Sequence, residues 1–120
     1  MSLMGQMYRD GKGVKQSHKM ARHLFEQAAQ QGDASAMCDL GDMYREGKGV
    51  EQSYEKAFEY YKQAAHLGYA TAQYNLGVMY AQGKGAESDI AKARVWWTKA
   101  AAQGDKGAAD NLKWIRGMCE

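Results

Sequence analysis

Apolar residues recur along the chain at the spacing of amphipathic helices. Between positions 33 and 46 the apolar members of this pattern are Ala36, Leu40, Met43 and Tyr44. Residues three or four positions apart lie on one face of a helix, so these side chains are expected to face a core. The run Gly47-Lys48-Gly49 follows, and glycine adopts the positive φ that ends many helices. We therefore predict a helix from about residue 33 to about residue 46.

A second helical pattern follows each glycine-rich run. Residues that cap helix N-termini well mark its start at three equivalent positions, namely Ser17, Ser53 and Asp89. Small and aromatic residues form its inner face, which in the second copy is Ala57, Tyr60, Tyr61, Ala64 and Ala65. Gly68 closes this helix. Because only a few residues connect the two helices, they are predicted to lie antiparallel.

The two-helix unit returns with a constant offset of 36 residues, as between Gly5, Gly41 and Gly77. The segment at 40–50, Leu-Gly-Asp-Met-Tyr-Arg-Glu-Gly-Lys-Gly-Val, has close counterparts at 4–14 and 76–86. Units of this kind bury their apolar faces against their neighbours and so stack into a solenoid. The chain is thus predicted to be all-α and to form one domain over 1–120. Its repeats are expected at about 1–32, 33–68 and 69–104, followed by a C-terminal capping helix at 105–118.

Residues that return at one repeat position are predicted to be structural. The main ones are Gly41 and Gly77, Tyr44 and Tyr80, Ala57 and Ala93, Met43 and Met79, and the aromatic series Phe25, Tyr61 and Trp97. The glycines need a reason, because glycine inside a helix costs about 1 kcal/mol relative to alanine. We predict that the second helix of each unit approaches too closely for a β-carbon, with its alanines forming the matching surface.

The end of the array departs from the repeat. Lys113 occupies the position of Gly77, and Arg116 occupies the position of Tyr80. Both residues are predicted to be exposed on a capping helix, since arrays need a polar outer face for solubility. Leu112 and Ile115 are expected to pack backward onto the third repeat.

The repeated residues resemble a known family. The first helix reads Ala-x-x-x-Leu-Gly-x-x-Tyr-x-x-Gly-x-Gly-Val, and the second reads Lys-Ala-x-x-x-Tyr/Trp-x-x-Ala-Ala-x-x-Gly at 56–68 and 92–104. This pattern resembles the Sel-one-like repeat (SLR), a relative of the tetratricopeptide repeat (TPR), over essentially the whole chain. The resemblance implies a TPR-like, right-handed α-α superhelix that serves as a protein-protein interaction scaffold. The Gly-Lys-Gly loop and the lack of proline favour SLR over TPR.

The resemblance also implies an alternative function. Some cysteine-rich relatives are described as β-lactamase-like, which leaves a hydrolase or penicillin-binding activity as the second hypothesis. Those relatives carry regularly spaced disulfide cysteines, whereas this chain has Cys38 and Cys119 alone. A well-shaped pocket with convergent polar groups would favour the alternative. Self-association through the N-terminal face is a third class that the sequence leaves open.

First-helix positions that escape the repeat pattern are the candidate binding surface, since in relatives of this architecture those helices line the concave face. Tyr74, Val78 and Trp114 are predicted to form a pocket for an apolar anchor of a protein or peptide partner. Asn75 and Asn111 share one repeat position and could hydrogen-bond an extended backbone. The second repeat offers a more charged end, with Cys38 expected to be exposed there. The residues concerned are Cys38, Asp39, Asp42, Arg45 and Glu46.

The remaining patterns indicate no catalytic, metal or cofactor site. A phosphate loop needs Gly-x-x-x-x-Gly-Lys-Ser/Thr after a strand, so the thrice-repeated Gly-Lys-Gly is predicted to be a structural turn. His18, His23 and His66 do not share the four-residue spacing of a helical metal site and are expected to be exposed. A net charge of +2 with interleaved signs gives no argument for nucleic acid. Membrane insertion and a signal peptide are not predicted, and the compartment, cytoplasm or periplasm, stays open.

Overall fold

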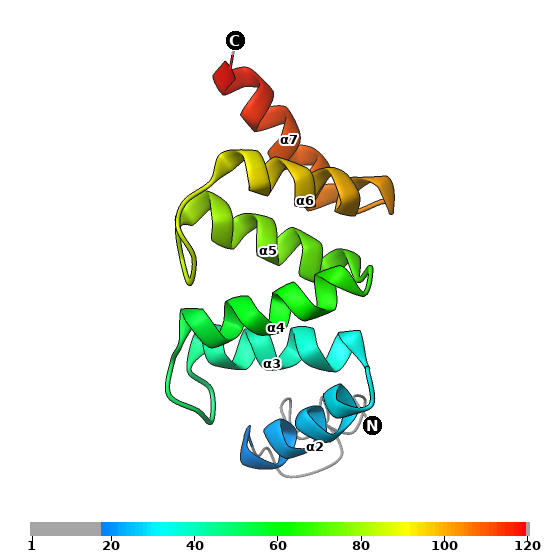
Figure 1. Cartoon of the computed structure of the whole chain (residues 1–120), viewed down its shortest axis with the longest axis vertical. Helices are drawn as coiled ribbons and strands as arrows, with labels where there is room; N and C mark the ends of the chain where they lie inside the picture. The colour runs from blue at the N-terminus through cyan, green and yellow to red at the C-terminus, as the bar shows by residue number, and fades with distance from the viewer. Residues whose placement is uncertain (1–17, 120) are drawn as a thin grey trace.

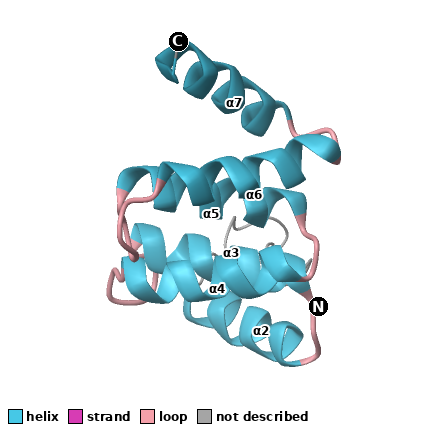
Figure 2. Ribbon diagram, turned by 45° about the horizontal axis from the view of Figure 1, so that its top comes forward, coloured by secondary structure: helices cyan, strands magenta, loops and turns pink. Residues whose placement is uncertain are grey.

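The computed structural model describes residues 18–119, which form six α-helices and no strand (Figures 1 and 2). Successive helices are stacked along the long axis of the molecule, as Figure 1 shows. The helices are α2 (His18–Gln30), α3 (Ala34–Glu46), α4 (Tyr54–His66), α5 (Ala70–Gln82), α6 (Ile90–Ala102) and α7 (Lys106–Cys119). The predicted all-α solenoid is confirmed. The first helix of the first repeat lies outside the described residues.

The second helix of each unit begins at the predicted cap. Ser53 accepts a hydrogen bond of 3.2 Å from the backbone N–H of Lys56, and Asp89 accepts one of 3.0 Å from that of Lys92. These bonds satisfy N–H groups that have no partner within the first helical turn. The equivalent Ser17 lies outside the described residues.

The Gly-Lys-Gly runs are structural turns, as predicted. Gly47 and Gly83 end α3 and α5 with φ of +71° and +68°. The N–H of Gly47 donates to the carbonyl of Met43 at 2.8 Å, which satisfies a carbonyl at the helix end. A β-carbon on Gly85 would meet the backbone of Tyr54 at the start of α4. The loop of one repeat therefore lies against the second helix of the repeat before it.

An aromatic ring, rather than a surface of alanines, covers each mid-helix glycine. A β-carbon on Gly41 would lie 2.6 Å from Cε1 of Tyr61, and one on Gly77 would overlap the indole of Trp97. The prediction of close approach by the second helix is confirmed for these two glycines, while the predicted alanine partner is wrong. Both rings belong to the second helix of the repeat that contains the glycine, where the aromatic position faces the glycine. Gly5 lies outside the described residues.

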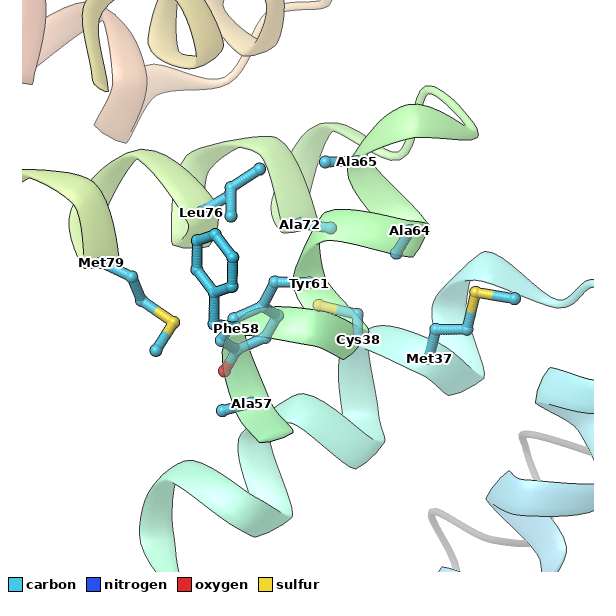
Figure 3. Packing of buried hydrophobic residues seen from close by; sticks show 10 residues of the cluster. All are labelled: Met37, Cys38, Ala57, Phe58, Tyr61, Ala64, Ala65, Ala72, Leu76 and Met79. Atoms are coloured by element: carbon cyan, nitrogen blue, oxygen red, sulfur yellow. The ribbon is translucent and has the colours of Figure 1, made fainter. Parts of the chain in front are cut away.

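The buried residues fall into clusters between successive helices, as expected of a solenoid. The central cluster joins α3, α4 and α5, and Figure 3 shows its side chains. They are Met37, Cys38, Ala57, Phe58, Tyr61, Ala64, Ala65, Ala72, Leu76 and Met79. The last cluster holds α7 on the third repeat, with Ile115 buried and Leu112 packed beside it, as predicted. Lys113 is exposed, as predicted, and the side chain of Arg116 lies outside the described part of the chain.

Tyr44 and Tyr80 pack against the central core cluster, as predicted, whereas the surface assignment of His18 needs correction. Both tyrosines are half-buried, and Tyr44 stacks on Tyr60 with ring centroids 5.8 Å apart. Their outer faces are covered by lysine ammonium groups rather than by apolar residues, as with Lys56 Nζ 5.3 Å from the centroid of Tyr44. His18 is half-buried instead of exposed, because the turn at Gly49 lies against it. His23 and His66 are exposed, as predicted.

Candidate partner-binding surface

The first helices of successive repeats lie side by side, and side chains join them directly. The amide of Asn75 on α5 donates to the thiol sulfur of Cys38 on α3 at 3.7 Å. A β-carbon on Gly107 of α7 would lie 3.0 Å from Cε2 of Tyr74 on α5. We call the outer surface of α3, α5 and α7 the first-helix surface, because the predicted binding residues belong to these helices.

A pocket of about 330 Å³ lies on this surface between α5, α6 and α7. It brings together four of the predicted residues, and no charged side chain lines it. The lining residues are Tyr74, Val78, Ala81, Gln82, Ile90, Trp97, Asn111 and Trp114. The pocket is thus largely apolar, with the amides of Gln82 and Asn111 and the hydroxyl of Tyr74 as its polar groups.

Trp114 differs from the other two apolar residues of the predicted pocket. It is 61% exposed, whereas Tyr74 and Val78 are half-buried and pack against the last core cluster. Tyr74 and Val78 therefore also contribute to the packing of the fold. The ring of Tyr74 occupies the space that a β-carbon on Gly107 would need. Trp114 is the one member of the three whose large apolar surface folding leaves in contact with solvent.

Three pocket positions on α5, those of Val78, Ala81 and Gln82, are charged one repeat earlier, where they are Asp42, Arg45 and Glu46. Asp42 stands in place of Val78, and its carboxylate accepts a hydrogen bond from the hydroxyl of Tyr61. The guanidinium of Arg45 lies 3.5 Å from Asp42 and 3.2 Å from Glu46, which is also paired with Lys48 at 2.9 Å. The hydrogen bond from Lys48 holds the pKa of the Glu46 carboxyl below its usual value. Asp42 and Arg45 thus form a partly exposed ion network at the α3 end of the surface.

The prediction that Cys38 is exposed on this surface is wrong. The residue is 3% exposed and belongs to the central cluster. Burial, followed by the negative charges of Asp42 and Asp39, raises the pKa of the thiol to about 12. Cys38 is therefore a protonated core thiol at neutral pH, and it does not have the thiolate that a nucleophile needs. Asn75 contacts this sulfur, so only Asn111 of the two equivalent asparagines lines the pocket.

Sequence reasoning missed part of the pocket wall. Trp97 lines it although its position in the repeat is a core position, and Ile90 reaches it from the first turn of α6. Gly107 also went unnoticed, although it breaks a series in which Ser35 and Thr71 hold the same position. That missing side chain is the signal that would have placed the Tyr74 ring against α7.

Other surface features give no catalytic arrangement. A depression of about 750 Å³ lies over α4, lined mainly by the exposed residues Glu55, Lys56, Glu59 and Gln63 and by the half-buried Tyr60. Within residues 18–119, no cluster of three or more histidine, cysteine, aspartate or glutamate side chains could hold a metal ion. Among the described helices, none has both the length and the apolar character that crossing a membrane requires.

Known structures share this architecture. A Sel1 repeat protein from Oxalobacter formigenes is 31% identical with a TM-score of 0.89, over 92% of this chain and 46% of that one. The protective antigen c5321 of uropathogenic Escherichia coli, which displays an SLR fold, is 33% identical with a TM-score of 0.93, over 97% of this chain and 25% of its own. Cysteine-rich protein B of Helicobacter pylori is 25% identical with a TM-score of 0.78, over 91% and 84% of the two chains.

The chain spans less than half of the first two of these proteins. A comparison with curated protein sequences gave no match. The family model described as Sel1 repeat matches three consecutive segments, residues 1–33, 34–69 and 70–105. With the repeat pattern, the stacked helices and these matches together, the chain belongs to the Sel1 repeat family.

Proposed function

We propose that this chain is a protein-protein interaction module that holds a segment of a partner on its first-helix surface, with an apolar side chain of the partner in the pocket beside Trp114. Sel1 repeat chains are typically interaction scaffolds. The observation that carries the proposal is the exposed indole of Trp114 at the rim of an uncharged pocket. Exposed apolar clusters rimmed by polar groups tend to mark interaction sites, and tryptophan is enriched among the residues that dominate binding.

The chemistry of the surface supports binding rather than turnover. The polar side chains that line the pocket carry amides and a hydroxyl, which can hydrogen-bond a peptide backbone, and no carboxylate or imidazole lines it. Cys38 is buried and protonated, and so is not available as a nucleophile. The hydrolase alternative is therefore not favoured.

Selection of peptides from a random display library tests this proposal. Peptides selected on the wild-type chain should share an apolar residue and should bind Trp114→Ala about 30-fold more weakly, as expected for loss of an anchor worth about 2 kcal/mol. Leu67→Ala is the matched control, because Leu67 is 58% exposed and lies at the end of α4, outside the pocket. Selected peptides that bind Trp114→Ala as tightly as wild type would exclude this site.

A further inference from the structure

We infer that the chain has a second docking surface, on α4 and α6, which takes an acidic segment of a partner protein that carries an apolar residue among its carboxylates. The surface is centred on three exposed lysines, Lys62, Lys92 and Lys99, which we call the lysine strip. None of these lysines lines the pocket beside Trp114. The inference therefore goes beyond the proposed function and stands without it.

Aromatic rings join the lysines of α4 to those of α6. Lys62 Nζ lies 6.0 Å from the ring centroid of Phe58, whose ring meets that of Tyr80 edge to face with centroids 5.3 Å apart. Lys92 Nζ lies 5.5 Å from the centroid of the same Tyr80 ring. One aromatic pair, at the end of α5 and on α4, thus connects Lys62 with Lys92.

A second contact joins the two helices one turn further along. His66 follows Lys62 by four residues on α4, so the two side chains share a helix face. Trp96 stands in the same relation to Lys92 on α6. The rings of His66 and Trp96 meet edge to face with centroids 5.0 Å apart, and Lys99 Nζ lies 4.7 Å from the centroid of Trp96. The three lysines therefore lie along one strip that spans α4 and α6.

The positive charge of the lysine strip is not balanced by carboxylates. Helix α6 carries Lys92, Arg94 and Lys99 in its 13 residues and no acidic residue. The last part of α4, residues 60–66, carries Lys62 and no acidic residue. None of the ion pairs within the described part of the chain includes a lysine of the strip. An aromatic ring attracts an ammonium group through its quadrupole but has no net charge, so the strip keeps its positive charge.

Two observations favour an acidic protein segment over a nucleic acid. Val95 lies between Lys92 and Lys99 on α6, at helical spacing from both, and is 52% exposed. An exposed aliphatic side chain between ammonium groups suits a segment that combines an apolar residue with carboxylates. Glu55 and Glu59, on the preceding turns of α4, are exposed, and a phosphate backbone that continued along α4 would meet their negative charge.

Defined peptides test the inference. The probes are fluorescein-labelled decapeptides with capped ends, in which a central Leu is flanked by four Glu, four Gln or four Lys residues and Gly fills the other positions. Fluorescence anisotropy gives their dissociation constants at low and high salt. At low salt we expect the Glu peptide to bind about tenfold more tightly than the Gln peptide, and the Lys peptide to bind most weakly. The differences should shrink at high salt, because salt screens exposed charges.

Matched variants locate the site. Lys62→Gln combined with Lys99→Gln should weaken binding of the Glu peptide about fivefold at low salt. Lys92→Gln alone is a milder second variant and should weaken it about twofold. The control pair, Lys19→Gln with Lys113→Gln, changes the net charge equally at exposed positions of α2 and α7 and should leave binding nearly unchanged. Equal losses in the two pairs would overturn the inference, because net charge rather than the strip would then attract the peptide.

The apolar contact has its own test. Val95→Gln should weaken binding of the Glu peptide about threefold and should not affect a Glu peptide with Gly in place of Leu. An equal effect on these two peptides would overturn the contact at Val95.

Three further outcomes would overturn the inference. The first is equal binding of the Glu and Gln peptides, or no binding of the Glu peptide. The second is an oligothymidine of 20 nucleotides that binds more tightly than the Glu peptide and is weakened by the Lys62 and Lys99 pair, which would assign the strip to nucleic acid. The third is loss of the Glu peptide from Trp114→Ala, which would place this peptide in the pocket and leave the proposed function standing.

Discussion

The indole N–H of Trp97 donates a hydrogen bond of 3.1 Å to the carbonyl oxygen of Tyr74. The same ring covers Gly77 about one turn further along α5. One side chain of α6 therefore fixes the position of α5, fills the gap left by a glycine and lines the pocket. In the second repeat Tyr61 covers Gly41 in the same way, but its hydroxyl donates to the carboxylate of Asp42. The same repeat position thus holds a residue that lines the pocket in the third repeat, Trp97, and one that bonds a carboxylate in the second, Tyr61. Repeat position alone therefore does not separate core residues from candidate binding residues.

Gly41→Ala is expected to lower the free energy of unfolding by about 1–3 kcal/mol, through overpacking against the ring of Tyr61. The sign of this change is informative. Alanine has the better helix propensity by about 1 kcal/mol, so without the ring the same substitution would raise the free energy of unfolding. Urea denaturation provides the measurement. Gly41→Ala should cost less in a Tyr61→Leu background, where the ring is absent. An unchanged denaturation midpoint for Gly41→Ala in the wild-type background would refute the close approach.

Trp114 and Tyr74 should respond differently to truncation. Trp114→Ala is expected to change stability by no more than about 0.5 kcal/mol, because the residue is 61% exposed. Tyr74→Ala should lower the melting temperature clearly, because its ring packs against Gly107 and the last core cluster. Thermal melts of the two single variants decide the matter. A marked loss of stability in Trp114→Ala would mean that the indole belongs to the core of the cap.

Gln73 should be replaceable by the residue of the preceding repeat. It is 4% exposed, donates to the carbonyl of Ala65 at 3.2 Å and accepts from Gln103 at 3.0 Å. Both partners keep a second bond, since Gln103 also donates to Gly68 and the carbonyl of Ala65 also accepts from the N–H of Gly68. Gln73→Met, which reproduces buried Met37, is therefore expected to be nearly neutral or stabilising in urea denaturation.

The smaller residue serves as the control at the same site. Gln73→Ala leaves a space where the side chain packed, so it should cost more stability than Gln73→Met. If Gln73→Met proves the more damaging of the two, the hydrogen bonds of Gln73 matter more than its volume.

Cys38 is expected to be unreactive in the folded chain. In a Cys119→Ser background, a thiol reagent at pH 8 should modify it only at the rate at which the chain unfolds, because burial raises the pKa of this thiol to about 12. The proton is held more tightly in the folded state, so the stability that this linkage contributes is complete below the unfolded pKa of about 8.5. It is lost progressively as the pH rises from there toward 12.

The same shift has a second readout. Cys38→Ala should make the free energy of unfolding fall less steeply with pH over this alkaline range, in urea denaturation at several pH values. Rapid modification of Cys38 under native conditions would show that the thiol is reached without unfolding.

The sequence by itself determined the repeat, the helices and much of their boundaries. Ser53 and Asp89 cap α4 and α6 at the predicted positions, and Gly47 and Gly83 end α3 and α5. These features are local, since a cap is decided by a side chain and the N–H groups two or three residues away. The offset of 36 residues then places equivalent helices in equivalent positions. The candidate pocket was also predictable in part, because Tyr74, Val78 and Trp114 depart from the pattern and meet in one place.

Only the tertiary structure decided which of the residues that depart from the repeat pattern are buried. Cys38 lies beneath Asn75, 37 residues later in the chain, and Tyr74 lies against Gly107 in the next repeat. Among the residues that the structure describes, none covers the indole of Trp114, which is 61% exposed. Periodicity places a residue on a helix face, but burial depends on the volume of the side chain that the adjacent repeat presents to it. That volume changes from repeat to repeat, so a large residue at one position finds a gap and at the next remains in solvent.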